Sequence, residues 1–321
     1  MIRWFAAVAM TLCCGSDLMS AQQTAATPRI GLLLAGSAAS AAELAAFRKG
    51  LSENRIDPDR DVELRVRDSL PSGSSDDEAK ALTPASVLVG SSLREVQTLR
   101  RLAPSTPIVM VAVGDPVGAG LAESMERPGG RVTGLSDFRA DYAEIRLSLL
   151  SDLLPGRHRF GFLHNPDAPT AKLTRQAALR RGIDLVPLAA RTPAEIDAVL
   201  TAANHSPMDA ILVVPFPASF ERRHSIGEWA SDRNLPIMFG YAEFMDLPDQ
   251  IGAVASYGTD LLELYRRAAG YAAAILRGAE AAELAIQRPE KGNLVVNLRV
   301  ARRLGISIPD SVIRQADLVM R

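Results

Sequence analysis

The sequence is nearly free of cysteine. Its only two cysteines, Cys13 and Cys14, lie within the first 21 residues. A mature chain lacking that segment has no thiol, which excludes thiol catalysis. It also has no means of forming a wrong disulfide in an oxidising compartment.

Neither sign of charge is in excess. The 36 basic and 37 acidic side chains leave a net charge of −1, so there is no electrostatic basis for binding nucleic acid and no acidic tail. Basic pairs such as Arg180-Arg181 are short and fit solvated helix faces.

The sequence also lacks the common enzyme motifs. It has no Gly-Lys-Ser or Gly-Lys-Thr phosphate loop and no Gly-x-Ser-x-Gly elbow. Gly118-Ala119-Gly120 resembles part of a dinucleotide fingerprint, but Glu123 occupies the third glycine position. The four histidines show no metal-ligand spacing. We therefore predict that the chain is not an enzyme and needs no cofactor and no metal.

The N-terminus has the layout of a secretory signal peptide. Arg3 is followed by an apolar run, Trp4 to Cys14, that is too short to cross a bilayer. Small and polar residues follow, and cleavage after Ala21 fits the preference for small side chains. This predicts export to the periplasm; a buried N-terminal helix is the alternative. Lipid attachment through Cys13 or Cys14 is a further alternative, but Met10-Thr11-Leu12 matches the lipidation pattern poorly. No later apolar run is long enough to span a membrane.

From Ile30 onward, apolar segments of strand length alternate with amphipathic helical patterns. Two such series, separated near 132–138, predict two parallel-sheet α/β units. Asp115-Pro116 is predicted to begin a helix. The tail after Ser256 is too long to cap the second unit alone, so we expect part of it to return to the first unit and form a hinge.

Small and polar residues follow the predicted strands, where an open parallel sheet binds ligands. Serines at helix N-termini favour a ligand carboxylate, Asp115 or Glu243 suits a ligand ammonium, and aromatic rings suit apolar parts. Each also has a structural role that competes with binding: helix capping for Ser92 and Asp115, a turn for Asn165, and core packing for the aromatics. The candidate ligand-binding residues are Ser37, Ser91, Ser92, Asp115, Asn165, Phe216, Tyr241, Glu243 and Tyr257.

Long segments resemble one bacterial family. VGDPVGAGLAESMERPGGRVTG at 113–134 closely resembles a hallmark of the tryptophan/tyrosine-type ABC transporter substrate-binding protein family. AAFRKGL at 45–51, FLHNPDAPT at 162–170 and the segment from Ser256 to Asp317 match in the same order. The resemblance covers about nine-tenths of the mature chain.

The resemblance implies a type I periplasmic-binding fold, a clamshell of two Rossmann-like lobes joined by a three-segment hinge. The implied division is a signal peptide at 1–21, a first lobe at 28–134 plus 256–280, and a second lobe at 135–255 plus 281–321. By motif position, Ser92 matches a pocket threonine or serine of the family and Asp115 matches the aspartate of its GDPVGAG motif. Asn165 matches the asparagine at the end of a second-lobe strand, and Tyr257 matches the tyrosine of the SYG motif. The sequence departs from the family pattern at Gly90-Ser91-Ser92, at Phe216, at 240–244 and in a shortened stretch at 68–86, and several of these departures fall at the expected ligand site.

The predicted function is solute binding for an ABC importer. The chain is expected to bind a small amino-acid-like or other polar metabolite between its lobes and deliver it to an ABC permease with its ATPase. It is expected to be monomeric. The alternatives are a ligand-sensing partner of a membrane receptor and, with less support, a two-domain α/β enzyme. A sugar-repressor relative is not expected, because it would carry a helix-turn-helix head where this sequence has a predicted signal peptide.

Overall fold

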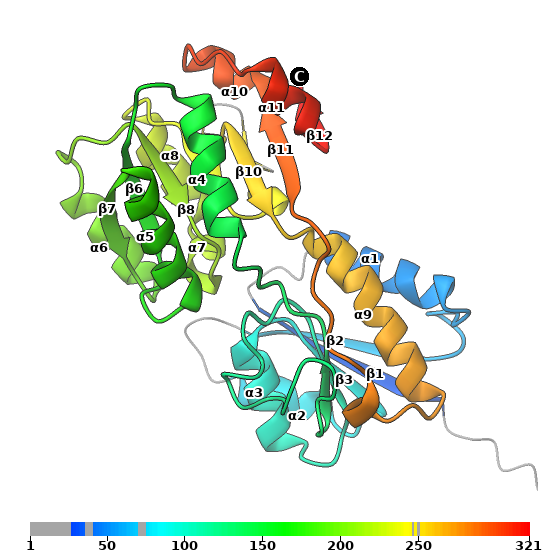
Figure 1. The fold of residues 1–321 in the computed structure, drawn as a ribbon. Helices are drawn as coiled ribbons and strands as arrows, with labels where there is room; N and C mark the ends of the chain where they lie inside the picture. Colours follow the sequence, from blue (N-terminus) through cyan, green and yellow to red (C-terminus); the bar gives the residue numbers. More distant parts are fainter. Residues whose placement is uncertain (1–26, 36–40, 70–74, 246, 249–250) are drawn as a thin grey trace, which may run out of the picture.

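The computed structural model describes residues 27–35, 41–69, 75–245, 247–248 and 251–321. They form two lobes, each built on its own sheet with helices on both faces (Figure 1). This confirms the predicted two-lobed α/β fold. The predicted signal peptide, Cys13, Cys14 and Ser37 lie outside the described residues.

The first lobe contains a five-stranded, fully parallel sheet in the order β2-β1-β3-β4-β5. In β1 the side chains alternate between two cores: Leu32 and Leu34 enter one, and Leu33 enters the other. Because both faces of the sheet are buried, the strand sequences are apolar at consecutive positions rather than at every second one. The strands are β1 (Arg29–Ala35), β2 (Glu63–Ser69), β3 (Val87–Gly90), β4 (Ile108–Met110) and β5 (Val132–Gly134).

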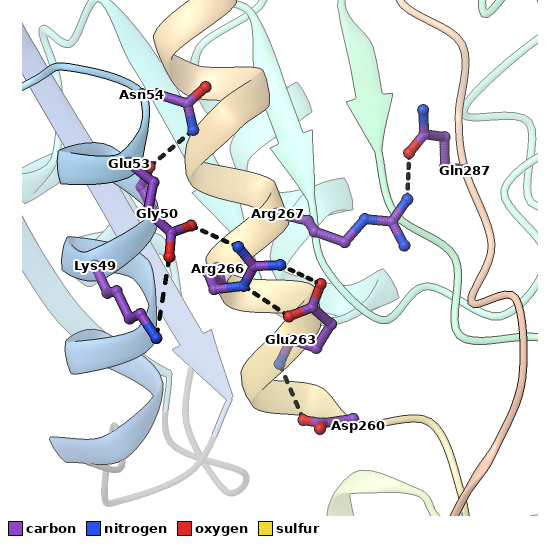
Figure 2. A network of polar contacts seen from close by, with 9 residues as sticks. All are labelled: Lys49, Gly50, Glu53, Asn54, Asp260, Glu263, Arg266, Arg267 and Gln287. Atoms are coloured by element: carbon purple, nitrogen blue, oxygen red, sulfur yellow. Dashed lines mark hydrogen bonds and ion pairs between the residues drawn. The ribbon is translucent and has the colours of Figure 1, made fainter.

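Helices from opposite ends of the chain cover one face of this sheet. Helix α1 (Ala41–Glu53) lies beside α9 (Leu261–Leu276), as Figures 1 and 2 show. They approach so closely at Gly50 that a Cβ there would lie 2.0 Å from the carbonyl oxygen of Arg266. Arg266 also bonds Glu53 of α1 at 2.5 Å (Figure 2). The other face carries α2 (Asp76–Ala81) and α3 (Leu93–Leu102), and the 3-10 turn η2 (Ala281–Glu283) lies against β5.

The second lobe contains a seven-stranded sheet in the order β12-β11-β10-β9-β8-β6-β7. Strands β6 to β10 are parallel, whereas β11 pairs antiparallel with β10. The strands are β6 (Arg159–His164), β7 (Asp184–Ala189), β8 (Ala210–Val213), β9 (Ile237–Phe239), β10 (Ala255–Gly258), β11 (Asn293–Asn297) and β12 (Leu318–Met320).

Two apolar cores enclose this sheet, one on each face. Phe160 and Phe162 face the core that holds α4 and α5, while Leu163 faces the core that holds α6 to α8. The helices are α4 (Tyr142–Leu153), α5 (Pro169–Arg181), α6 (Pro193–Ala202), α7 (Pro217–Glu221), α8 (Arg223–Ser231), α10 (Leu298–Arg303), α11 (Asp310–Gln315) and the 3-10 turn η1 (Ala242–Met245).

Three segments connect the lobes: 135–141 after β5, 259–260 after β10, and 287–292 before β11 (Figure 1). They are bonded to one another. Leu135 and Gln287 form a β-bridge, and Thr259 Oγ1 donates to the Asp137 carbonyl at 3.1 Å. Arg139 Nη1 donates to the Pro289 carbonyl at 3.1 Å. The three segments are therefore joined into one hinge.

The sheet pairings place two segments differently from the division made on sequence. That division assigned 256–280 to the first lobe, but β10 pairs with β9 and β11 in the second sheet. Conversely, Ile286 packs in the first lobe's core, whereas 281–321 was assigned to the second lobe.

The helix predicted after Asp115 is also absent. A single turn forms instead, closed by the Asp115 carboxylate accepting from the Gly118 N–H at 2.9 Å. Gly118 and Gly120 both lie in this short stretch; glycine disfavours helix, and Gly120 adopts a positive φ.

Candidate functional site

The carboxyl ends of the parallel strands in both sheets face the region between the lobes. Strand β5 ends at Gly134 and the chain passes directly to the second lobe; β10 ends at Gly258 and the chain passes directly back. Because the neighbouring strands are parallel, their carboxyl ends lie at these same edges. Parallel sheets bind ligands there, so the interlobe face is the candidate site.

The two serines after β3 have their hydroxyl groups bonded within the first lobe. Ser91 Oγ accepts from the Ala35 N–H at 2.6 Å and also bonds the buried hydroxyl of Tyr265. Ser92 precedes α3 with extended backbone, as an N-cap residue does, but its hydroxyl donates to the Glu95 carboxylate. The Ser92 hydroxyl has therefore committed its one proton to Glu95 and can meet a further group only as an acceptor.

Asp115, Asn165 and Phe216 follow β4, β6 and β8, so all three lie at the interlobe edges. Asp115 is exposed and closes its turn through one oxygen. Asn165 Oδ1 accepts from the Asp167 N–H at 3.0 Å. Asn165 therefore has the turn-stabilising role that the sequence offered as the alternative to ligand contact. Phe216 is half-buried against the α6–α8 core.

Tyr257 lies at the hinge. Its ring meets Tyr142 edge to face, with centroids 5.5 Å apart. Gly292, in the third hinge segment, packs on the same ring, where a Cβ would lie 2.5 Å from Cζ. Burial raises the pKa of the Tyr257 hydroxyl. This tyrosine therefore links α4, β10 and the hinge.

The predicted residue Tyr241 belongs to a buried cluster at the hinge, with two charged residues, Asp137 and Arg146, that the sequence reasoning missed. The Tyr241 hydroxyl, after β9, donates to the Asp137 carboxylate in the first hinge segment. Arg146 of α4 is 4% exposed; its Nε donates to the Tyr257 carbonyl at 2.7 Å and its Nη2 to the Gly240 carbonyl at 3.1 Å. Burial raises the pKa of Asp137, raises that of Tyr241 strongly and lowers that of Arg146.

Tyr241 contacts both lobes through its ring, while its hydroxyl reaches the hinge. The ring packs against the first lobe's α1–α9 core and the second lobe's α6–α8 core. Of the sequence-predicted residues, it makes the most direct bridge between the two lobes.

Glu243 makes a second bridge between the lobes. Its Oε1 accepts from the N–H of Leu261, the first residue of α9, at 3.0 Å. Its Oε2 is buried and has no hydrogen-bond partner. Burial, together with the nearby Asp260 and Glu43 carboxylates, raises the pKa of this carboxyl to about 7.

Among the described residues, no three His, Cys, Asp or Glu side chains gather as a metal site requires. In the same part of the chain, no helix is both long and apolar enough to span a membrane. The candidate site thus consists of hydrogen-bonding groups at the strand ends, the tyrosines Tyr241 and Tyr257, and the buried charged residues Asp137, Arg146 and Glu243.

Comparisons with known proteins agree on one family. The model of the family described as ABC transporter substrate binding protein matches residues 46–320. A tyrosine-binding protein of Clostridioides difficile (strain R20291) is 24% identical over 201 residues, which is 60% of this chain and 54% of that protein. The chain thus spans about half the length of this curated relative.

Solved structures resemble nearly the whole chain. A conserved domain protein from Vibrio cholerae O1 biovar El Tor superposes with a TM-score of 0.79 at 27% identity, covering 91% of this chain and 99% of that one. An ABC domain in complex with L-Trp from Streptococcus pneumonia superposes with a TM-score of 0.77 at 25% identity. The match covers 91% of this chain and 100% of that one. The ligand-free, open form of CD0873 from Clostridium difficile, at 19% identity, has the same fold with a TM-score of 0.65.

The family consists of substrate-binding proteins rather than enzymes, which confirms the prediction that the chain is not an enzyme. The family match covers most of the sequence and both lobes. The chain therefore belongs to the ABC transporter substrate binding protein family.

Proposed function

We propose that this protein is the exported solute-binding component of an ABC importer. It binds a small, amino-acid-like molecule between its lobes and presents the closed form to a membrane permease with its ATPase. Residues 1–21 act as the signal peptide, and the mature protein works in the periplasm as a monomer without a cofactor.

The observation that carries the proposal is that the parallel strands of both sheets turn their carboxyl ends toward the region between the lobes, across one three-segment hinge. A ligand that contacts both edges stabilises the closed arrangement relative to the open one. The ligand class is supported by the L-Trp complex of the Streptococcus protein and by the tyrosine-binding relative.

We assign the ligand contacts to residues at the interlobe edges. Asp115, Asn165 and Phe216 follow strands, and Tyr241, Glu243 and Tyr257 border the hinge. Ser91 and Ser92 shape the start of α3, whose first turn offers backbone N–H groups. The Ser91 N–H itself donates to the Leu33 carbonyl at 3.2 Å, and the hydroxyls of both serines are bonded within the lobe.

The test is a melting-temperature screen on the chain from Gln22 onward, unfolded and refolded to remove bound ligand. The probes are L-tryptophan, L-tyrosine, other amino acids, nucleobases, small carboxylates and sugars. A ligand that binds only the native state adds about 2.7 kcal/mol at a hundredfold excess over its Kd, which raises the Tm of a chain this size by several degrees.

Asp115→Asn places the site, because the amide oxygen preserves the turn to Gly118 while the charge is removed. A reduced ligand shift in this variant supports the interlobe site. Asp77→Asn on α2 is the matched control and should leave the shift unchanged. If a well-folded protein shows no shift with any probe, the solute-binding proposal for these classes fails.

A further inference from the structure

A short segment of the second lobe reaches across to the first. Gly240 to Met245, called here the latch segment, follows β9 and includes η1. Its start is anchored in the second lobe, where the Gly240 carbonyl accepts from Arg146 Nη2 of α4 at 3.1 Å. Near its end, the buried Phe244 ring packs in the α6–α8 core, with its centroid 4.9 Å from that of Phe239. The latch segment is therefore fixed to the second lobe on both sides of its turn.

Two side chains between these anchors contact the hinge and the first lobe. The Tyr241 hydroxyl donates to the Asp137 carboxylate, and the ring packs against the α1–α9 core of the first lobe. Glu243 Oε1 accepts from the N–H of Leu261, the first residue of α9, at 3.0 Å. The latch segment thus adds a fourth, non-covalent connection to the three hinge segments. A lobe movement that carries α9 away from η1 breaks the Glu243 bond.

The Glu243 carboxyl is poorly placed to carry a charge in this connection. Oε2 is buried and has no hydrogen-bond partner. The charges that act on the carboxyl come from Asp260, which caps α9 (Figure 2), and from Glu43 of α1, and both are acidic. The hydroxyls of Tyr241 and Tyr265 also lie within its influence, and burial raises the pKa of each well above its usual value, so they stay neutral. Ionisation of Glu243 therefore places a negative charge in a buried junction beside two carboxylates.

We propose that the latch segment is a pH-sensitive connection between the lobes, which is closed while Glu243 is protonated and weakened when Glu243 ionises. A neutral carboxyl keeps its bond to the Leu261 N–H at no electrostatic cost. A charged carboxyl is stabilised by release, because water then reaches it and its distance from Glu43 grows. The device makes lobe movement easier as the pH rises. It acts whatever solute the protein carries, so it does not depend on the proposed function.

The test measures how often the Leu261 amide is released, by hydrogen exchange on the purified, ligand-stripped protein at pH 5 and 7.5. NMR gives the exchange rate of this amide, and division by its intrinsic rate at each pH gives an opening constant. The Glu243 carboxyl has a pKa of about 7 in the latched form and an ordinary value of 4.5. The latch is therefore strongest below pH 4.5 and weakens toward pH 7, and the opening constant should rise on the order of 50-fold.

Three variants separate the parts of the latch. Glu243→Gln still accepts from the Leu261 N–H but cannot ionise, so its opening constant should be the same at both pH values. Glu228→Gln, an exposed change on α8 of the same lobe, should show the full rise. Tyr241→Phe keeps the ring but removes the bond to Asp137. It should raise the opening constant about 10-fold at both pH values, as for loss of a hydrogen bond to a charged group.

Each contrary outcome has a distinct meaning. A pH-independent opening constant in the unaltered protein, or an equal rise in Glu243→Gln, overturns the pH-sensitive connection. An unchanged opening constant in Tyr241→Phe means that Leu261 exchanges by local fraying of α9, and it overturns the latch between the lobes. The measurement on the unaltered protein can refute the proposal even if a variant does not fold. Because no ligand is used, failure of the solute-binding proposal leaves these results intact.

Discussion

Replacing Glu243 by Gln should stabilise the ligand-free protein at pH 8 and change it little at pH 4.5. Burial, reinforced by Asp260 and Glu43, raises the pKa of this carboxyl from 4.5 to about 7. Between these values the unfolded chain loses its proton while the folded protein keeps it. The stability that this group contributes is therefore complete below pH 4.5, is lost as the pH rises, and is fully lost above pH 7.

The size of the effect follows from the pKa difference. About 2.5 pH units at 1.36 kcal/mol per unit gives a penalty of about 3 kcal/mol above pH 7. Glutamine is neutral throughout and avoids this penalty, while its amide oxygen still accepts from Leu261 N–H. The difference in unfolding free energy between variant and wild type should thus grow from near zero to about 3 kcal/mol.

Urea unfolding at half-unit steps from pH 4.5 to 8, at constant ionic strength, measures this difference. Other titrating groups are common to both proteins and cancel in the comparison. Glu228→Gln serves as the control and should show no pH-dependent difference. A constant difference, or a variant that is less stable at pH 8, would show that the buried carboxylate is ionised and favourably held, and would refute the reasoning.

Two further substitutions probe the packing at the hinge. Arg146→Met leaves the Tyr257 and Gly240 carbonyls without their donor in a buried setting, so the unfolding free energy should fall by about 3 kcal/mol or more; an unchanged urea midpoint would contradict this. Gly258→Ala places a Cβ 1.7 Å from the Gly240 carbonyl oxygen and should cost about 3 kcal/mol, whereas Gly130→Ala, with open space around it, should unfold like the wild type.

The alternation of apolar strands and amphipathic helices was enough to predict two parallel-sheet lobes. Leu32 and Leu34 on one face of β1 and Leu33 on the other illustrate why: a strand buried on both faces must be apolar at consecutive positions. The lobe boundaries were harder to predict. Gly258-Thr259-Asp260 reads as an ordinary turn before a helix, and only the long-range pairing of β10 with β9 and β11 decides its sheet.

The candidate site was partly predictable for the same reason. Residues after strands were identified because strand ends bind ligands, but their hydrogen bonds, such as Ser92 to Glu95, depend on packing. Arg146 was missed although the sequence carries a signal for it. It shares the buried face of α4 with Tyr142, Leu147 and Leu150, and a charged side chain in an apolar stripe implies a buried partner. Asp137 carries no such signal.

The close contact between α1 and α9 has a consequence for how the chain acquires its structure. The first lobe needs α9 to cover the core around Phe47 and Leu51, yet a ribosome completes the whole of β6 to β10 before it makes α9. The first lobe therefore begins to be synthesised before the second lobe, but it can complete its fold only after most of the second lobe has been made. Truncation after Gly258 should leave a hydrophobic face of the first sheet uncovered and prone to aggregation, whereas the full-length chain supplies the α9 helix that α1 packs against.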